Sequence, residues 1–202
     1  MSEARPAPRW WAWLLERHLS RGPRAPRLTA AERARLQEEL ERLTGIDAMT
    51  GLLNRSTARQ RLHAENLGGT AGVMLLLDLD SFKAVNDQFG YVTGDVALCV
   101  LADRFRDACP DGSTLSRWSG EEFLVLLPGA TLREGVVLAL ELAAAVRAPV
   151  DARGTTLYLR ASVGVARWTD GDVEGCTDRA EACAYRAKES QDDVVTEGDL
   201  LG

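Results

Sequence analysis

The feature that most constrains the fold is an unbroken apolar run, Val73–Leu77, which ends at Asp78. A strand with one solvated face alternates apolar and polar residues, so a continuous apolar run predicts a central strand covered on both faces. Such a strand carries Asp78 to the end of a sheet. Because burying a charge is costly unless the charge is paired, a carboxylate at this point indicates a functional site.

Hydrophobic periodicity around this strand predicts one ferredoxin-like α/β (α+β) domain. The 202 residues, 46% of them apolar, suffice for one core and a short extension. The predicted elements are a helix over 55–66, a strand over 73–78, helices over 81–108 with a break at 90–94, strands over 114–118 and 122–127, a helix over 132–146, a strand over 156–166 and a helix over 177–190. From the first strand this order is β-α-β-β-α-β-α, which predicts an antiparallel sheet with helices on one face.

The amino-terminal part differs in composition from the rest. Residues 1–27 are rich in Arg, Pro and Trp and are interpreted as an arm, whose tryptophans can dock on a membrane surface, on this protein's own body or on a partner. Residues 28–46 predict an amphipathic linker helix, because Thr29 and Glu32 have the spacing of a capping box. Two such helices can pair as a short coiled coil, through a seam formed by Leu36, Leu40 and Leu43.

Charge and cysteine content exclude several classes of protein. Residues 1–27 carry six Arg and two Glu, so the remainder holds eighteen of the 24 basic residues and twenty-eight of the 30 acidic ones. That acidic body is unsuited to binding nucleic acid, although it is compatible with a small triphosphate that carries Mg²⁺. The four cysteines lack CxxC spacing and predict reduced thiols in or near a core. No stretch is long enough for a membrane span, so we expect a cytoplasmic protein.

Two adjacent glutamates complete a candidate metal site. Ser119 and Gly120 lie between two apolar runs and predict a two-residue hairpin turn, which places Glu121 and Glu122 at the tip of a rigid ribbon. In a ferredoxin-like sheet this hairpin neighbours the first strand, so Asp78 is expected near Glu121. Clustered carboxylates are the hard oxygen ligands that Mg²⁺ prefers, and such a cluster can hold two metal ions.

Each residue alone also has a simpler interpretation. Asp78 and Asp80 can cap the following helix. Lys83 can be a solvated helix residue or, near helix amino-terminal amides, can reach a phosphate. Asn86 and Asp95 can be turn residues, but together they match the donor and acceptor pattern of a guanine edge.

Four short segments, in order, resemble the GGDEF family of diguanylate cyclases from Asp47 to about Val195. They are DAMTGLLNR (47–55), similar to DxLTGLxNR; DLDSFKAVNDQFGYVTGD (78–95), similar to DxDxFKxxNDxxGHxxGD; RWSGEEF (117–123), at the position of RxGGDEF; and ASVGVA followed by AYRAK (184–188), similar to the closing strand and YxAK helix. The resemblance implies a cyclase domain over 47–202, similar to nucleotide cyclase catalytic cores.

The resemblance also implies roles for individual residues. Asp78 and Glu121, with the backbone carbonyl of Leu79, are implied ligands of Mg²⁺ (Mn²⁺ is possible), and Glu122 is implied to assist the metal or the 3′-hydroxyl. The residues implied to bind GTP are Asn86 and Asp95 at guanine, and Phe82, Lys83 and Lys188 at the phosphates or nearby. Each domain of a homodimer would bind one GTP, and the two would be joined into cyclic di-GMP with release of two pyrophosphates.

The sequence departs from the family pattern at several positions. Ser119 replaces the first glycine of the signature, where a side chain can strain the turn or obstruct a nucleotide. Tyr91 replaces the usual His. Asp192 lies where an Arg that meets phosphate is expected, and residues 110–113, PDGS, replace the Arg-x-x-Asp of the inhibitory product site.

These observations support two functions of different classes. The first is a Mg²⁺-dependent diguanylate cyclase. The second is a degenerate GGDEF domain that binds GTP or cyclic di-GMP as a non-catalytic signalling module, which Ser119 and Asp192 favour. A cyclase that makes a mixed dinucleotide from ATP and GTP is disfavoured because Asp95 supplies a guanine-selective acceptor.

Overall fold

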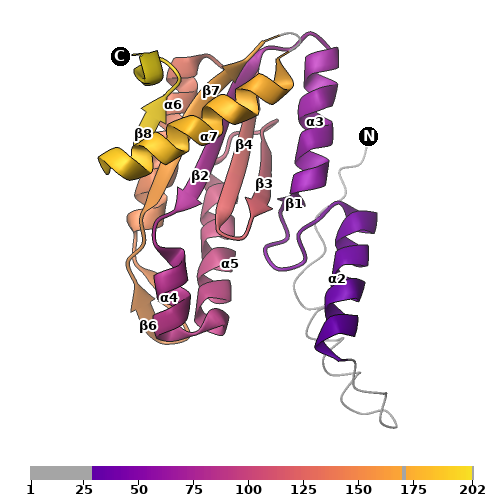
Figure 1. Cartoon of the computed structure of the whole chain (residues 1–202), viewed down its shortest axis with the longest axis vertical. Helices are drawn as coiled ribbons and strands as arrows, with labels where there is room; N and C mark the ends of the chain where they lie inside the picture. Colours follow the sequence, from indigo (N-terminus) through magenta and orange to yellow (C-terminus); the bar gives the residue numbers. More distant parts are fainter. Residues whose placement is uncertain (1–28, 170–171, 202) are drawn as a thin grey trace. The chain divides into compact units, whose positions relative to one another are not determined.

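The computed structural model describes residues 29–169 and 172–201 (Figure 1). The chain divides into two compact units between Glu39 and Leu40, and helix α2 (Ala30–Thr44) crosses that division. The helix begins with the predicted capping box. The Glu32 carboxylate accepts the amide hydrogen of Thr29 at 2.8 Å, and the Thr29 hydroxyl accepts the amide hydrogen of Glu32 at 3.2 Å. The arm predicted for residues 1–27 lies outside the described residues.

The second unit is built on a sheet with the strand order β1-β3-β4-β2-β7-β8. Its strands are β1 (Leu53–Asn54), β2 (Gly72–Leu79), β3 (Thr114–Ser119), β4 (Glu122–Pro128), β7 (Ala161–Trp168) and β8 (Val194–Thr196). The other elements are α3 (Arg55–Leu67), α4 (Phe82–Phe89), α5 (Tyr91–Ala108), α6 (Leu132–Arg147), the hairpin of β5 (Val150–Ala152) and β6 (Thr155–Leu157), α7 (Val173–Ser190) and the 3₁₀ turn η1 (Asp199–Leu201).

The centre of the sheet confirms the predicted ferredoxin-like arrangement. β2 pairs in antiparallel fashion with β4 on one side and with β7 on the other, and β3 pairs with β4 beyond it. β1 and β8 extend the two edges by parallel pairing with β3 and β7. The fold is therefore a mixed α/β structure with a mostly antiparallel sheet flanked by helices.

Helices cover both faces of the sheet, so the expectation of helices on one face was wrong. Val73, Leu75 and Leu77 of β2 pack with side chains of α5 and α6. Met74 and Leu76 point the other way and pack with side chains of α3 and α7. In Figure 1, α7 lies across the strands of the sheet. The reason lies in β2 itself, because a strand that is apolar on both faces must be shielded on both.

The strand predicted over 156–166 is in fact two strands in different sheets. Thr155–Leu157 forms β6, which folds back on β5 through a turn at Arg153 and Gly154, both with positive φ (58° and 82°). β7 begins only at Ala161. Gly supplies a positive φ readily, and this turn was not recognised because its other residue is an arginine.

The cysteines lie where the sequence predicts. None of the four thiols forms a disulfide with another described residue, and Cys176 and Cys183 of α7 are buried against the sheet. Burial raises the pKa of Cys176 to about 12 and that of Cys183 to about 11, so both are protonated near neutral pH. As for membranes, the described residues contain no helix with the length and apolar character needed to cross a bilayer.

We expect Gly164→Ala to destabilise the domain by about 3 kcal/mol. A Cβ atom at Gly164 of β7 would overlap the backbone oxygen of Ala180 and the backbone nitrogen of Ala184, and backbone atoms of α7 cannot move aside as a flexible side chain can. The measurement is the free energy of unfolding from urea titration. Gly120→Ala is the control, because a Cβ there meets no atom within 4 Å, and its free energy of unfolding should stay within about 0.5 kcal/mol of the wild type. Equal stability of the two variants would contradict the close approach of α7.

Candidate active site

The carboxyl end of β2 brings together side chains from three neighbouring strands. Asp78 lies opposite Glu122 of β4 and opposite Ser162 of β7. Alternate residues of a strand share a face, so Asp78 leaves the sheet on the face of Met74 and Leu76, beneath α7. Its side chain is 26% exposed. The structure therefore places a partly buried carboxylate next to the hairpin, as the sequence analysis expected.

Asp80 has a specific partner in this cluster. Its Oδ1 atom accepts a hydrogen bond from the Ser162 hydroxyl at 2.8 Å, and its amide donates to the carbonyl of Arg160 at 2.9 Å. The N-cap residue of α4 is Ser81, with φ of 53° and no side-chain capping bond. The interpretation of Asp78 and Asp80 as helix caps is therefore wrong, and both carboxylates remain at the sheet end.

Lys188 contacts Asp78 directly. From the last turn of α7, its Nζ atom lies 3.1 Å from both carboxylate oxygens of Asp78. Burial raises the pKa of Asp78, the charges of Glu122 and Asp80 raise it further, and the Lys188 ammonium opposes this rise. Lys188, which the sequence predicts to contact phosphates, thus neutralises the charge of Asp78, the predicted metal ligand.

The hairpin turn lies one residue later than predicted. Ser119 pairs with Glu122 after a bulge that follows Arg117, so the turn residues are Gly120 and Glu121. Ser119 does not have a positive φ, and the predicted risk of strain from its side chain is not realised. Instead, its hydroxyl donates a hydrogen bond to the Glu122 carboxylate. The serine therefore orients one of the two signature glutamates.

Contacts with the first motif fix the hairpin in place, a role that sequence reasoning missed. The Arg117 guanidinium donates to the carbonyl of Gly120 at 2.7 and 3.0 Å and forms an ion pair with Asp47 at 3.2 Å. The guanidinium of Arg55 lies 4.5 Å from the ring centroid of Trp118, a distance typical of a cation–π contact. The charges of the DAMTGLLNR and RWSGEEF segments were the only signal for this pairing.

The corner between α4 and α5 brings the two predicted guanine-reading residues together. Asn86 lies in α4, and Gly94 and Asp95 lie in the first turns of α5. Asn86 Oδ1 is buried and has no hydrogen-bond partner among the described residues, and a Cβ atom at Gly94 would overlap it. A buried acceptor without a partner is costly. The α4–α5 corner therefore holds an acceptor, Asn86 Oδ1, that a ligand's hydrogen-bond donor could satisfy, beside the half-buried carboxylate of Asp95.

The remaining predicted residues are placed differently from one another. Lys83 is exposed in the first turn of α4, at the same end of β2 as Asp78. Phe82 is 3% exposed and packs in the core, so its ring is not available to a ligand. The side chain of Leu79 is also buried, whereas its amide donates to the carbonyl of Glu121 at 3.3 Å. This last contact joins the end of β2 to the hairpin turn.

Asp192 does not lie one helical turn beyond Lys188. Helix α7 ends at Ser190, and Gln191 adopts a left-handed conformation with φ of 59°. The chain then turns so that Asp193 forms ion pairs with Arg147 and Arg160, while Asp192 is exposed. The structure therefore places the exposed Asp192 side chain after the end of α7 and not on the helix that carries Lys188.

The chemistry of the donors fits a hard divalent cation, although their present positions do not form a closed site. The described residues contain no group of three or more His, Cys, Asp or Glu side chains arranged around one point. Asp78 and Glu122 occupy paired strand positions, Glu121 lies at the adjoining turn, and the Lys188 ammonium is a stand-in cation on Asp78. Oxygen donors of this kind suit Mg²⁺.

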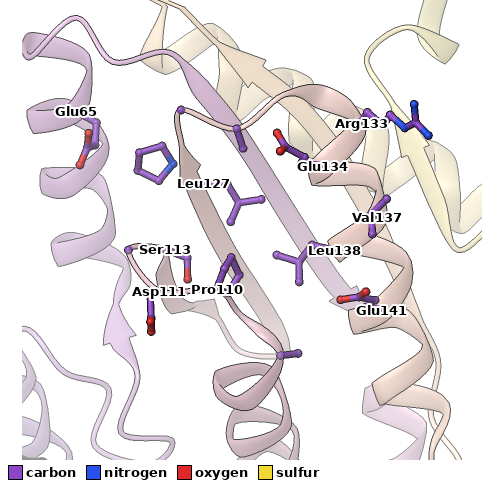
Figure 2. A pocket seen from close by; sticks show the side chains of 15 residues that line it. Glu65, Pro110, Asp111, Ser113, Leu127, Arg133, Glu134, Val137, Leu138 and Glu141 are labelled. Carbon is purple, nitrogen blue, oxygen red and sulfur yellow. The ribbon is translucent and has the colours of Figure 1, made fainter.

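A separate pocket of about 790 Å³ opens at the other end of the sheet (Figure 2). That end is marked by the pairing of Gly72 with Pro128, whereas Asp78 pairs with Glu122 at the opposite end. Residues 110–113, which lack the Arg-x-x-Asp pattern, line this pocket. Its charged side chains are Glu65, Asp111, Glu134 and Glu141 against one cation, Arg133. This excess of carboxylates disfavours an anionic dinucleotide.

Residues 44–193, which include every site residue named above, match the family model described as diguanylate cyclase, GGDEF domain. The chain belongs to the GGDEF domain family. All four motif segments of the sequence lie within, or overlap, the matched region of this GGDEF domain.

Relatives of this GGDEF domain include proteins with different names. Diguanylate cyclase DgcP of Pseudomonas aeruginosa is 35% identical over 148 residues, which cover 70% of this chain and 22% of DgcP. Cyclic di-GMP phosphodiesterase NbdA of the same organism is 33% identical over 174 residues, covering 83% of this chain and 22% of NbdA. The chain thus matches about a fifth of the length of each. Both names support a function related to cyclic di-GMP.

A solved structure shows the same fold. Diguanylate cyclase SiaD from Pseudomonas aeruginosa, crystallised in complex with its activator SiaC, has a TM-score of 0.71 and 30% identity. The match covers 93% of this chain and 74% of the SiaD chain. The mostly antiparallel sheet with flanking helices is therefore a fold shared with a GGDEF cyclase.

We expect Lys188→Met to raise the pKa of Asp78 further in the metal-free protein, because the ammonium that stabilises the ionised carboxylate is lost. A raised folded-state pKa means that the folded protein binds the proton more tightly than the unfolded chain. Stability therefore falls as pH rises from the ordinary Asp pKa of 3.8 through the folded-state value, and this fall should extend to higher pH in the variant.

The measurement is a carbon-detected NMR titration of the side-chain carboxyls. Arg186→Met is the matched control, because it removes an exposed cation of the same helix that has no contact with Asp78 in the part of the chain that the structure describes, and it should leave the titration of Asp78 nearly unchanged. An identical Asp78 pKa in the wild type and Lys188→Met would show that the contact does not form in solution.

Proposed function

We propose that this GGDEF domain is a diguanylate cyclase that condenses two molecules of GTP into cyclic di-GMP and two pyrophosphates. The observation that carries the proposal is the pairing of Asp78 at the end of β2 with Glu122 beside the hairpin turn. This arrangement presents carboxylates on the rigid end of a buried sheet, where oxygen ligands for Mg²⁺ can be assembled. Mn²⁺ is a suitable substitute, and a cytoplasmic location would supply GTP.

The proposed ligands are Asp78, Glu121 and the backbone carbonyl of Leu79, which all lie where β2 meets the hairpin. A bound Mg²⁺ would neutralise phosphate charge and lower the pKa of a coordinated hydroxyl. Lys188 must release Asp78 for this to occur, and its ammonium is then free to contact the triphosphate. Glu122, oriented by Ser119, assists the metal or accepts a hydrogen bond from the 3′-hydroxyl.

The α4–α5 corner is the proposed guanine site. The orphan acceptor of Asn86 and the carboxylate of Asp95 can both accept hydrogen bonds, and guanine presents the N1 and N2 hydrogens as donors. Lys83 is positioned to approach the phosphates from the start of α4. Recognition of the base at this corner and of the phosphates at the sheet end would orient the nucleotide between them.

Two such domains are required for the reaction. Each 3′-oxygen forms a bond to the α-phosphorus of the other GTP, the bond from that phosphorus to the bridging oxygen of the leaving group breaks, and pyrophosphate departs. The hydroxyl proton passes to a base or to water. The protein contributes by positioning and charge neutralisation, so a homodimer with facing sites is the proposed active form.

The second candidate is a non-catalytic module that binds GTP or cyclic di-GMP. It is favoured by one observation, that Lys188 occupies Asp78 and no closed group of metal ligands exists among the described residues. Incubation of the protein with GTP and Mg²⁺, followed by chromatography and mass analysis of the products, separates the two. Cyclic di-GMP formation, with a specific activity that rises with protein concentration, supports the cyclase. GTP that is bound but unchanged at high protein concentration supports the module.

We expect Glu121→Gln to reduce cyclic di-GMP formation to less than a tenth of the wild-type rate, because the amide retains the shape but removes a charge that holds the metal. The fold should persist, since the contact of Glu121 with Leu79 uses its backbone carbonyl. Glu141→Gln is the control, because that exposed glutamate lines the distant pocket and its loss should leave turnover unchanged. Substantial activity in Glu121→Gln would remove Glu121 from the metal site.

We expect Asp95→Ser to lower the preference for GTP over ATP about tenfold, because a half-buried acceptor paired with the guanine edge would be lost. The measurement is competition between the two nucleotides for binding. Asp107→Ser, which changes an exposed aspartate of the same helix, should leave the preference intact. If the preference is unaltered in Asp95→Ser, the residue serves only the turn of the α4–α5 corner.

A further inference from the structure

The triphosphate proposed to bind at the end of β2 would meet a strongly acidic surface. Asp78, Asp80 and Glu122 lie there together. Mg²⁺, Lys188 and Lys83 would offset only part of the combined negative charge of these carboxylates and the triphosphate. A further cation on the same face of the sheet is needed for a polyphosphate to be attracted rather than repelled.

We propose that Arg160 is a substrate-binding residue whose guanidinium contacts the phosphates of the bound nucleotide. The proposal rests on the cyclase or nucleotide-binding function proposed above and extends it to a residue outside the four motif segments.

The backbone of Arg160 belongs to the carboxylate cluster. Its carbonyl accepts the amide hydrogen of Asp80 at 2.9 Å. Pairing between the β2 and β7 segments therefore extends to Arg160, the residue just before β7 begins. Ser162, two residues later, contacts the Asp80 carboxylate at 2.8 Å and lies opposite Asp78. Arg160 therefore lies directly at the sheet end that bears the carboxylates.

The side chain of Arg160 runs toward the end of α7. Its Nη2 atom donates to the carbonyl of Gln191 at 3.0 Å and lies 3.5 Å from Asp193 Oδ1. Gln191 follows the last turn of α7, which carries Lys188 and its contact with Asp78. Two cations, one from the strand and one from the helix, thus approach the same corner of the domain.

The guanidinium has capacity for a ligand. The side chain is 49% exposed, and both of its contacts use Nη2, so Nε and Nη1 have no partner among residues 29–169 and 172–201. A planar guanidinium can bind a phosphate through two parallel hydrogen bonds while one nitrogen keeps its contact with a carbonyl. By contrast, Arg117 on the hairpin uses Nε, Nη1 and Nη2 in its contacts with Gly120 and Asp47.

A purely structural role makes a different prediction. Asp193 is contacted by both Arg160 and Arg147, and its carbonyl accepts the amide hydrogen of Val163. If Arg160 serves only to anchor the segment after α7, loss of Arg147 should have a comparable effect. Arg147 ends α6, is similarly exposed at 47%, and has no contact with the carboxylate cluster among the described residues, so it is a matched control.

The test measures binding of Mg²⁺ with a GTP analogue whose α–β bridge is a methylene group, so that no turnover occurs. Calorimetry of the full chain at low and high ionic strength should give a dissociation constant about five- to tenfold higher for Arg160→Gln, with the larger loss at low ionic strength. Arg160→Lys should fall between this variant and the wild type, and Arg147→Gln should bind as the wild type does. Equal weakening by Arg147→Gln, or wild-type binding by a folded Arg160→Gln, would overturn the assignment.

A second measurement needs no variant. Phenylglyoxal modifies exposed guanidinium groups, and peptide mass analysis reports each site separately. The Mg²⁺–analogue complex should protect Arg160 severalfold and leave Arg147 equally reactive. Unchanged modification of Arg160 when the analogue is bound would refute the contact. Failure of the wild type to bind the analogue at all would instead refute nucleotide binding, and with it the role of Arg160.

Discussion

The burial of β2 on both faces is the constraint on which the candidate site depends. Its side chains from Val73 to Leu77 are shielded by α5 and α6 on one face and by α3 and α7 on the other. A one-residue slip against β4 would exchange the two faces and turn Asp78 into the core beneath α5 and α6. Hydrophobic burial therefore fixes the register, and the register sets Asp78 opposite Glu122 and Ser162.

Electrostatic repulsion explains why the carboxylates at this end do not already form a closed metal site. Like charges close together in a partly buried place raise one another's free energy, so each carboxylate turns to the nearest donor. Asp78 contacts Lys188, Asp80 contacts Ser162 and Glu122 contacts Ser119. A divalent cation that bound here would have to compete with these three contacts. The affinity of such a cation would therefore depend on how weakly the donors hold the carboxylates, as well as on the number of acidic residues.

Local sequence patterns were sufficient to predict elements whose structure depends mainly on their own residues. The apolar run predicted β2, and the turn residues between apolar runs predicted the hairpin of β3 and β4. The turn was misplaced by one residue because a bulge after Arg117 adds a residue that alternation does not reveal. The β5–β6 hairpin was missed because Arg153 takes a positive φ that is rare for a non-glycine residue.

Contacts between distant segments were beyond the reach of such patterns. Lys188 and Asp78 are 110 residues apart, and Arg117 and Asp47 are 70 apart, so neither pairing leaves a periodic trace. The resemblance to the GGDEF family supplied candidate site residues but not the side chains that contact them. It placed Lys188 at phosphate, whereas the structure without ligands places it at a carboxylate. In the proposed function, the Lys188 ammonium would pair with Asp78 before the nucleotide binds and with a phosphate afterwards.

The backbone conformation of Gln191, at the end of α7, determines where the Asp192 carboxylate lies and how strongly its charge would act on a nucleotide. In a continued helix, Asp192 would stand one turn beyond Lys188 and would repel a triphosphate. The left-handed conformation of Gln191 ends the helix first, and the exposed Asp192 side chain is then surrounded by solvent that screens its charge. The carbonyl of Gln191, released from the helix, instead holds Arg160. The arginine that the family places after the helix lysine is thus absent from the sequence, and Asp192 stands at its position. In the structure, Arg160 from the neighbouring strand provides a cation near the same corner. Packing therefore reduces the loss of positive charge that the sequence alone indicates.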